Sequence, residues 1–131
     1  MSAKTAAIVI GLLFIAVGLL GYVNNPIIGE SETAIFHADS MLNLVHIISG
    51  VLFLVVAFAS PANAAMFCKI FGTVYLLLGV LGLFTIGSEG MTTLLGFLHV
   101  NGADNYLHIG LGLGILLAGF AARGTANVSR T

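Results

Sequence analysis

The sequence predicts an all-α membrane protein: a four-transmembrane-helix bundle built from two tandem helical hairpins in parallel repeat. Three observations support this fold class. Only 7% of the 131 residues are charged and 59% are hydrophobic, whereas about 25% of an ordinary soluble domain is charged. Four apolar stretches are each long enough to cross a bilayer. The second half of the chain also repeats the pattern of the first half.

The four apolar stretches define the predicted helices. A membrane-spanning helix needs about 20 mostly apolar residues, and the spans expected here cover about residues 6–23, 42–59, 67–86 and 105–122. None of them contains an acidic residue or an arginine. We expect Asp39 or Ser40 to cap the second helix and Asp104 to cap the fourth. Residues 92–100 are expected to form a loop or a short interfacial helix that lies in the membrane interface.

The charged residues predict how the chain is oriented. Lys4, Lys69, Arg123 and Arg130 fall in the N-terminal segment, the second connection and the C-terminal segment. All five acidic residues fall in the first and third connections. Because basic residues concentrate on the cytoplasmic side of membrane proteins, both termini are expected to be cytoplasmic.

The repeat is visible when the sequence is shifted against itself. A shift of 62 residues places His37, Asn43, His46 and Gly50 on His99, Asn105, His108 and Gly112. A shift of 61 residues places Gly11, Gly18 and Gly21 on Gly72, Gly79 and Gly82. We therefore expect one transmembrane domain over residues 1–131, with a first repeat at about 6–60 and a second at about 67–122. Parallel repeats of this kind are related by an axis along the membrane normal.

Each predicted helix carries two small residues seven positions apart, which is close to two helical turns. Small residues on one face let helix backbones approach closely in a bilayer, where van der Waals packing drives association. The expected packing positions are Gly11, Gly18, Gly50, Ala57, Gly72, Gly79, Gly112 and Gly119.

The four histidines are the main chemical feature of the sequence. His46 and His108 share a helix face with the small residues, so both are expected to point into the bundle. His37 and His99 precede them by nine residues and are expected on loops over the outer mouth. An ionisable side chain inside a membrane span is costly and normally has a partner or a role.

Three interpretations of the histidines remain open. They could ligate copper, zinc or iron together, or His46 and His108 could be axial ligands of a haem; Asn43 and Asn105 would then orient the rings. They could be structural and hydrogen-bond to the outer loops. They could form a proton relay or a pH-responsive gate with the nearby acidic residues, which are Glu30, Glu32, Asp39, Glu89 and Asp104.

Composition excludes several functions. A net charge of −1 gives no electrostatic basis for binding nucleic acid. Cys68 is the single cysteine, so an internal disulfide and a thiolate zinc site are both excluded. No nucleotide-binding or hydrolase motif is present. The favoured function is a non-enzymatic membrane module whose outer mouth holds His37, His46, His99 and His108 and either binds a metal ion or haem there or uses the cluster to brace a subunit interface. The alternatives are an accessory structural subunit of a larger complex, or of a homo-oligomer, and a small transporter or channel.

The motifs Asn43-x-x-His46-x-x-x-Gly50 and Asn105-x-x-His108-x-x-x-Gly112 carry a family resemblance. They resemble those of a family of small bacterial four-helix integral membrane proteins catalogued as a domain of unknown function. The resemblance covers about residues 5–122. It implies a location in the bacterial inner membrane, and it implies no activity, substrate or cofactor.

Overall fold

The computed structural model describes residues 2–31, 33–86, 91–94 and 98–122. Four helices dominate it: α1 (Ala3–Leu20), α2 (Ser40–Ala59), α3 (Ala64–Ile86) and α4 (Gly102–Ala121). A 3-10 turn, η1 (Pro61–Asn63), joins α2 to α3. The prediction of a mostly helical chain is confirmed. Helices α1, α3 and α4 begin about one turn earlier than the sequence predicted.

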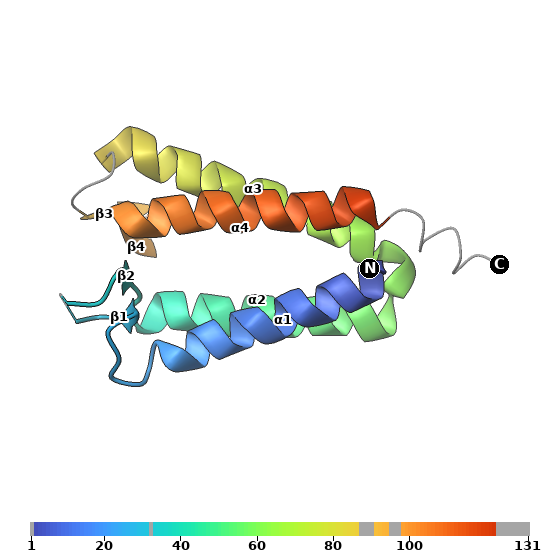
Figure 1. Cartoon of the computed structure of the whole chain (residues 1–131), viewed down its shortest axis with the longest axis horizontal. Helices are drawn as coiled ribbons and strands as arrows, with labels where there is room; N and C mark the ends of the chain where they lie inside the picture. Colours follow the sequence, from blue (N-terminus) through green and yellow to red (C-terminus); the bar gives the residue numbers. More distant parts are fainter. Residues whose placement is uncertain (1, 32, 87–90, 95–97, 123–131) are drawn as a thin grey trace.

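The helices form two antiparallel hairpins, α1 with α2 and α3 with α4 (Figure 1). Short strands gather at one end of the molecule, and η1 and the start of α1 lie at the other end (Figure 1). Strands β1 (Ile28–Gly29) and β2 (Phe36–His37) pair in parallel. Strands β3 (Met91–Leu94) and β4 (Leu98–Asn101) pair antiparallel.

The β3–β4 pairing corrects the expectation for residues 92–100. Thr92 faces Val100 and Thr93 faces His99 across the two strands, so the segment is extended on both sides of residues 95–97, which lie outside the described residues. The β-branched residues Thr92, Thr93 and Val100 favour strands over helices. The apolar content of residues 92–100 does not distinguish a strand from a helix.

The N-terminal caps of α2 and α4 occupy positions related by the 62-residue shift. The Asp39 side chain accepts a hydrogen bond from the Leu42 N–H at 3.0 Å, as expected. For α4, Asn101 is the capping residue and accepts from the Asp104 N–H at 2.9 Å. Asp104 accepts in return from the Asn101 N–H at 2.9 Å. The expectation that Asp104 caps α4 is therefore wrong, because this reciprocal capping box starts the helix three residues earlier.

Three helical segments are long and apolar enough to cross a membrane: Ala3–Leu20, Ser40–Ala59 and Pro61–Thr85. Their mean hydropathies are 2.3, 2.4 and 2.0. Helix α4 is of similar length, but its first turns carry the polar residues Asp104, Asn105 and His108. These residues lower its hydropathy and place a polar layer at the strand end of the molecule.

Within each hairpin, glycines lie directly against the partner backbone. A Cβ atom at Gly11 would lie 2.8 Å from the Gly50 carbonyl oxygen, and one at Gly72 would lie 2.8 Å from that of Gly112. Any side chain at these positions would push the helices apart. The two hairpins thus use positions 61 or 62 residues apart in the same way.

Candidate functional site

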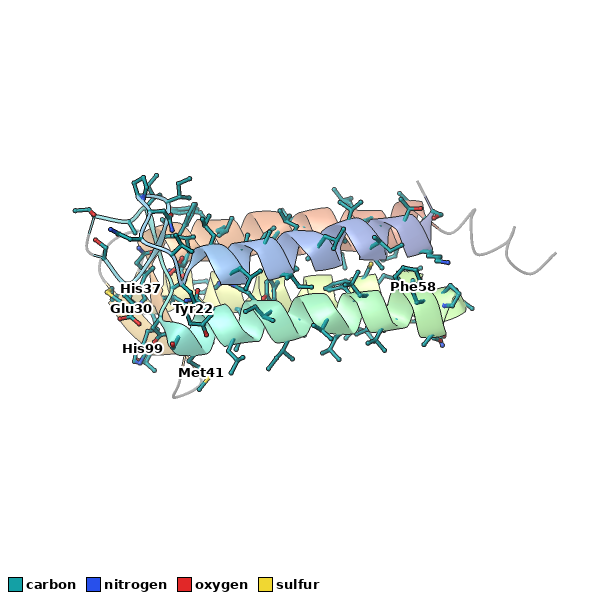
Figure 2. The ribbon with its side chains drawn as sticks, turned by 90° about the horizontal axis from the view of Figure 1, so that it is seen from below. Tyr22, Glu30, His37, Met41, Phe58 and His99 are labelled. Carbon is teal, nitrogen blue, oxygen red and sulfur yellow. The ribbon has the colours of Figure 1, made fainter. Side chains whose placement is uncertain are left out.

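The structure separates the four histidines into two pairs. His46 on α2 and His108 on α4 are buried, with exposed fractions of 2% and 3%. His37 on β2 and His99 on β4 lie at the strand end of the molecule, and Phe58 lies at the other end (Figure 2). The predicted four-histidine set is therefore not brought together, and only the inner pair lies in the helical interior.

Two aromatic rings lie between the inner histidines. The Phe14 ring is 5.9 Å from His46, and the Tyr75 ring is 5.4 Å from His108. Phe14 and Tyr75 contact each other edge to face at 5.2 Å. The four rings therefore form a row that runs from one hairpin to the other. Phe14 is not among the residues predicted for the site, although the 61-residue shift places it on Tyr75.

The inner histidines have unused hydrogen-bonding capacity. Among the described residues, no partner contacts the Nδ1 atom of His46 or of His108, and both atoms are fully buried. Buried polar atoms in proteins nearly always have a hydrogen-bond partner, so each exception needs an explanation.

Asn43 and Asn105 lie one turn before the inner histidines and are buried at 2% and 0% exposure. Their amide groups pack directly on glycines of the partner segment, Asn43 on Gly21 just after α1 and Asn105 on Gly82 in α3. A Cβ atom at either glycine would collide with the amide oxygen. These asparagines thus fix how α1 meets α2 and how α3 meets α4 at the level of the histidines.

A second polar group joins the hairpins at the strand end. The Asn101 side chain donates to the Ile35 carbonyl at 3.2 Å. The backbone N–H of His37 donates to Asp104. His99 Nε2 lies 3.9 Å from Asp39 Oδ2 at an exposed position. The outer histidines therefore belong to contacts between the two connections.

Asp104 is the one described carboxyl group that combines deep burial with a shifted pKa. It precedes the predicted span of residues 105–122 and is 2% exposed. Burial raises its pKa to about 7, because desolvation penalises the carboxylate. Hydrogen bonds from the Asn101 and His37 backbone N–H groups oppose this shift. The group therefore titrates near neutral pH.

Two cavities lie close to the polar residues. The first has a volume of about 290 Å³ and opens at the strand end beside Asn43, Glu30 and the turn that follows α1. The second has a volume of about 160 Å³ and lies between α1 and α4, next to His46. Apart from His46, its lining is apolar: Leu13, Phe14, Val17, Leu107 and Leu111.

The described residues do not form a multidentate metal site. They contain no group of three or more His, Cys, Asp or Glu side chains able to hold a metal ion. A haem ligated by both His46 and His108 would meet the rings of Phe14 and Tyr75, which contact those two histidines and each other.

No curated protein and no solved structure matches this chain. The family described as Domain of unknown function (DUF4383) matches residues 4–121. This match spans all four helices and both histidine motifs, apart from the first residue of α1. The chain therefore belongs to the family described as Domain of unknown function (DUF4383).

Proposed function

We propose that the chain is a four-span membrane protein made of two repeated hairpins, with both termini in the cytoplasm of a bacterial cell. The matching glycine contacts within the two hairpins support the repeat. The fourth span is residues 105–122, inside and just beyond α4. In this orientation the strand end of the molecule faces away from the cytoplasm. The polar residues at the start of α4 then lie near the outer membrane surface.

The positions of the charges support this orientation. Lys4 lies over the Phe58 ring at 5.1 Å, and Lys69 lies over the Phe120 ring at 4.5 Å, both at the η1 end. Glu30, Asp39 and Asp104 lie in or next to the strand-end connections. Positive charge at one end and negative charge at the other is the pattern expected when the η1 end is cytoplasmic.

Within this topology, we propose that the protein binds an uncharged small molecule at the inner histidines, His46 and His108. The observation that carries the proposal is the pair of fully buried Nδ1 atoms without hydrogen bonds. Polar side chains inside a membrane span are expensive and mark ligand or ion sites. A neutral ligand is favoured over a metal ion because no third donor of the usual kinds joins the pair in the described residues.

The test compares ligand content across three proteins purified in mild detergent. They are the wild type, an inner variant (His46→Phe with His108→Phe) and an outer variant (His37→Ala with His99→Ala). Phenylalanine keeps a ring of similar shape and removes the nitrogens. Organic extracts are analysed by mass spectrometry and metals by elemental analysis.

We expect a small molecule at about one per chain in the wild type and the outer variant, and its loss from the inner variant. A metal that is present in the wild type and the outer variant but absent from the inner variant would show that the ligand is a metal ion and not a neutral molecule. Equal contents in all three proteins, or empty protein in every case, would contradict a ligand role. The inner histidines would then be structural, as in an accessory subunit of a larger complex.

A further inference from the structure

The cavity of about 290 Å³ lies where α1 ends and opens at the strand end of the molecule. Its lining comes from the turn that follows α1, from β1 and the residues after it, and from the first turn of α2. Polar and apolar side chains both contribute, and Glu30 is the only charged residue in the lining. Glu30 and Tyr22, which also lines the cavity, both lie at the strand end (Figure 2).

The wall of this cavity is fixed by hydrogen bonds. The Asn25 Nδ2 atom donates to the carbonyl oxygens of Leu20 at 2.8 Å and of Ile28 at 2.9 Å. The Asn25 Oδ1 atom accepts from the Ile28 N–H at 2.9 Å. The Tyr22 hydroxyl donates to the Ser40 carbonyl at 3.2 Å, which ties the turn to the start of α2. The lining is therefore already arranged before a ligand arrives.

The repeat does not supply this wall to the second hairpin. Helix α1 ends at Leu20, whereas α3 continues to Ile86. The 61-residue shift places Tyr22 and Asn25 on Leu83 and Ile86, which both belong to α3. The polar groups of the cavity are thus specific to the first hairpin, and the packing shared by the two hairpins does not require them.

The charge around the cavity is negative. No Lys or Arg occurs between residues 5 and 68 or between residues 70 and 122. Among the described residues, none pairs with the Glu30 carboxylate or donates a hydrogen bond to it. The carbonyl groups at the end of α1 form the negative end of its helix dipole. The cavity therefore favours a cation.

The groove on the α1–α4 side is a different kind of hollow. It has a volume of about 230 Å³ and an apolar lining that includes Ala6, Gly110 and Gly114. A Cβ atom at Gly110 or Gly114 would meet no described atom within 4 Å. The 62-residue shift places these two glycines on Ile48 and Leu52, so this hollow face of α4 does not follow from the repeat. Its side chains offer no polar group that would select a ligand.

We propose that the cavity at the end of α1 binds the primary ammonium group of a linear aliphatic amine, with Glu30 as its counter-ion. This site is separate from the inner histidines and goes beyond the proposed function. A protonated amine has three N–H donors and no acceptor, which suits a carboxylate without a partner. The Tyr22 ring is 53% exposed and provides a cation–π contact. Val23 and Ile28 provide apolar contacts for the carbon chain.

The test uses nuclear magnetic resonance of protein labelled with 13C-tyrosine, in nanodiscs of phosphatidylcholine, a lipid without a primary amine. The chain has three tyrosines, so Tyr75→Phe and Tyr106→Phe assign the ring signals. The probe is pentylamine, which is protonated at neutral pH, and 1-pentanol is its uncharged control. We expect pentylamine to shift the Tyr22 signals saturably and pentanol to leave them unchanged. The signals of buried Tyr75 should move with neither compound.

Glu30→Gln should weaken pentylamine binding about tenfold or more, because the contact with a charged partner is lost. Glu30 is exposed, so the variant should fold. The matched control is Asp39→Asn, which removes the same charge from the strand end at a residue outside the cavity lining. Asparagine caps a helix as well as aspartate does. The control should bind pentylamine within about twofold of the wild type, because exposed charges at a distance are screened.

The proposal is overturned if pentylamine leaves the Tyr22 signals unmoved. It is also overturned if Glu30→Gln and Asp39→Asn weaken binding equally, since the amine would then be attracted by the acidic surface in general. Calcium ions that shift Tyr22 through Glu30 when pentylamine does not would replace the amine by a metal ion.

A second set of nanodiscs, made with phosphatidylethanolamine, distinguishes a free amine from a lipid headgroup. If this lipid abolishes the response of Tyr22 to pentylamine, the site holds and its ammonium group comes from the lipid. We expect the response to persist, which assigns the site to a free amine. The stretches of chain between the basic residues offer no Lys or Arg beside the cavity to accompany the phosphate of a lipid.

Discussion

The contacts within a hairpin and the contacts between hairpins are of different kinds. Within a hairpin, glycine backbone lies against helix backbone, as at Gly11 with Gly50 and at Gly72 with Gly112. Between hairpins, the contacts are made by side chains, chiefly the rings of Phe14, Phe53, Phe67, Phe71 and Tyr75. A backbone contact tolerates no added atom, whereas a side-chain contact can be reshaped. The interface between hairpins is therefore where a ligand site can form.

The largest effect is expected from breaking a backbone contact. Gly112→Leu would place side-chain atoms against the Leu76 N–H and 2.8 Å or less from the Gly72 carbonyl oxygen. Helix α4 could not keep its distance from α3, and the free energy of unfolding should fall by about 3 kcal/mol or more. The free energy of unfolding is measured in mixed micelles, with circular dichroism as the signal for loss of helix. Gly110→Leu on the same helix is the control and should unfold like the wild type.

A smaller effect is expected from the ring cluster between hairpins. Phe53 is fully buried and contacts Phe67 and Phe71. Phe53→Ala leaves a cavity, and in a bilayer the loss is mainly one of packing, so the free energy of unfolding should fall on the order of 2 kcal/mol. The same micelle unfolding experiment applies, with the exposed Phe58→Ala as control. A loss equal to that of Gly112→Leu would show that the two interfaces do not differ.

The smallest effect is expected at the polar contact between the connections. Because the pKa of Asp104 is raised to about 7 in the folded protein, from 3.8 for an unburied carboxyl group, the folded state binds the extra proton. Stability should therefore be full below about pH 4, near the pKa of the unfolded state, and fall as the pH rises through about 7. Near neutral pH, between about pH 6 and about pH 7, the fall is roughly 1 kcal/mol. Unfolding of Asp104→Asn as a function of pH should lack this fall. Asp39→Asn should retain it, and a fall of equal size in both variants would assign the titration to another group.

Much of the helical framework could be predicted from the sequence. Apolar length located the helices, because Pro26 and Pro61 and their polar neighbours end the apolar stretches. The shared helix face of His46 with Gly50 and of His108 with Gly112 predicted that both histidines point inward, and both are buried. These features depend on neighbours within one helix or one hairpin, which the sequence pattern records directly.

The rest of the site depends on contacts between hairpins, which the pattern does not record. The row of rings through Phe14 and Tyr75 requires knowing which helices meet across the interface. The capping role of Asn101 depends on the exact start of α4, and apolar length fixes helix ends only loosely. The hollow face at Gly110 and Gly114 is visible in the sequence only when it is compared with Ile48 and Leu52.

The η1 turn joins the two hairpins into one polypeptide, so a substitution in one hairpin need not occur in the other. In a homodimer of identical hairpins, every substitution appears twice, once on each side of the symmetry axis. Enlarging one groove would enlarge the other, and filling one with phenylalanine would fill both. A single polypeptide escapes this constraint. Phe67 can occupy the position that corresponds to Ala6, so that one side of the molecule is filled with rings while the other side keeps a groove.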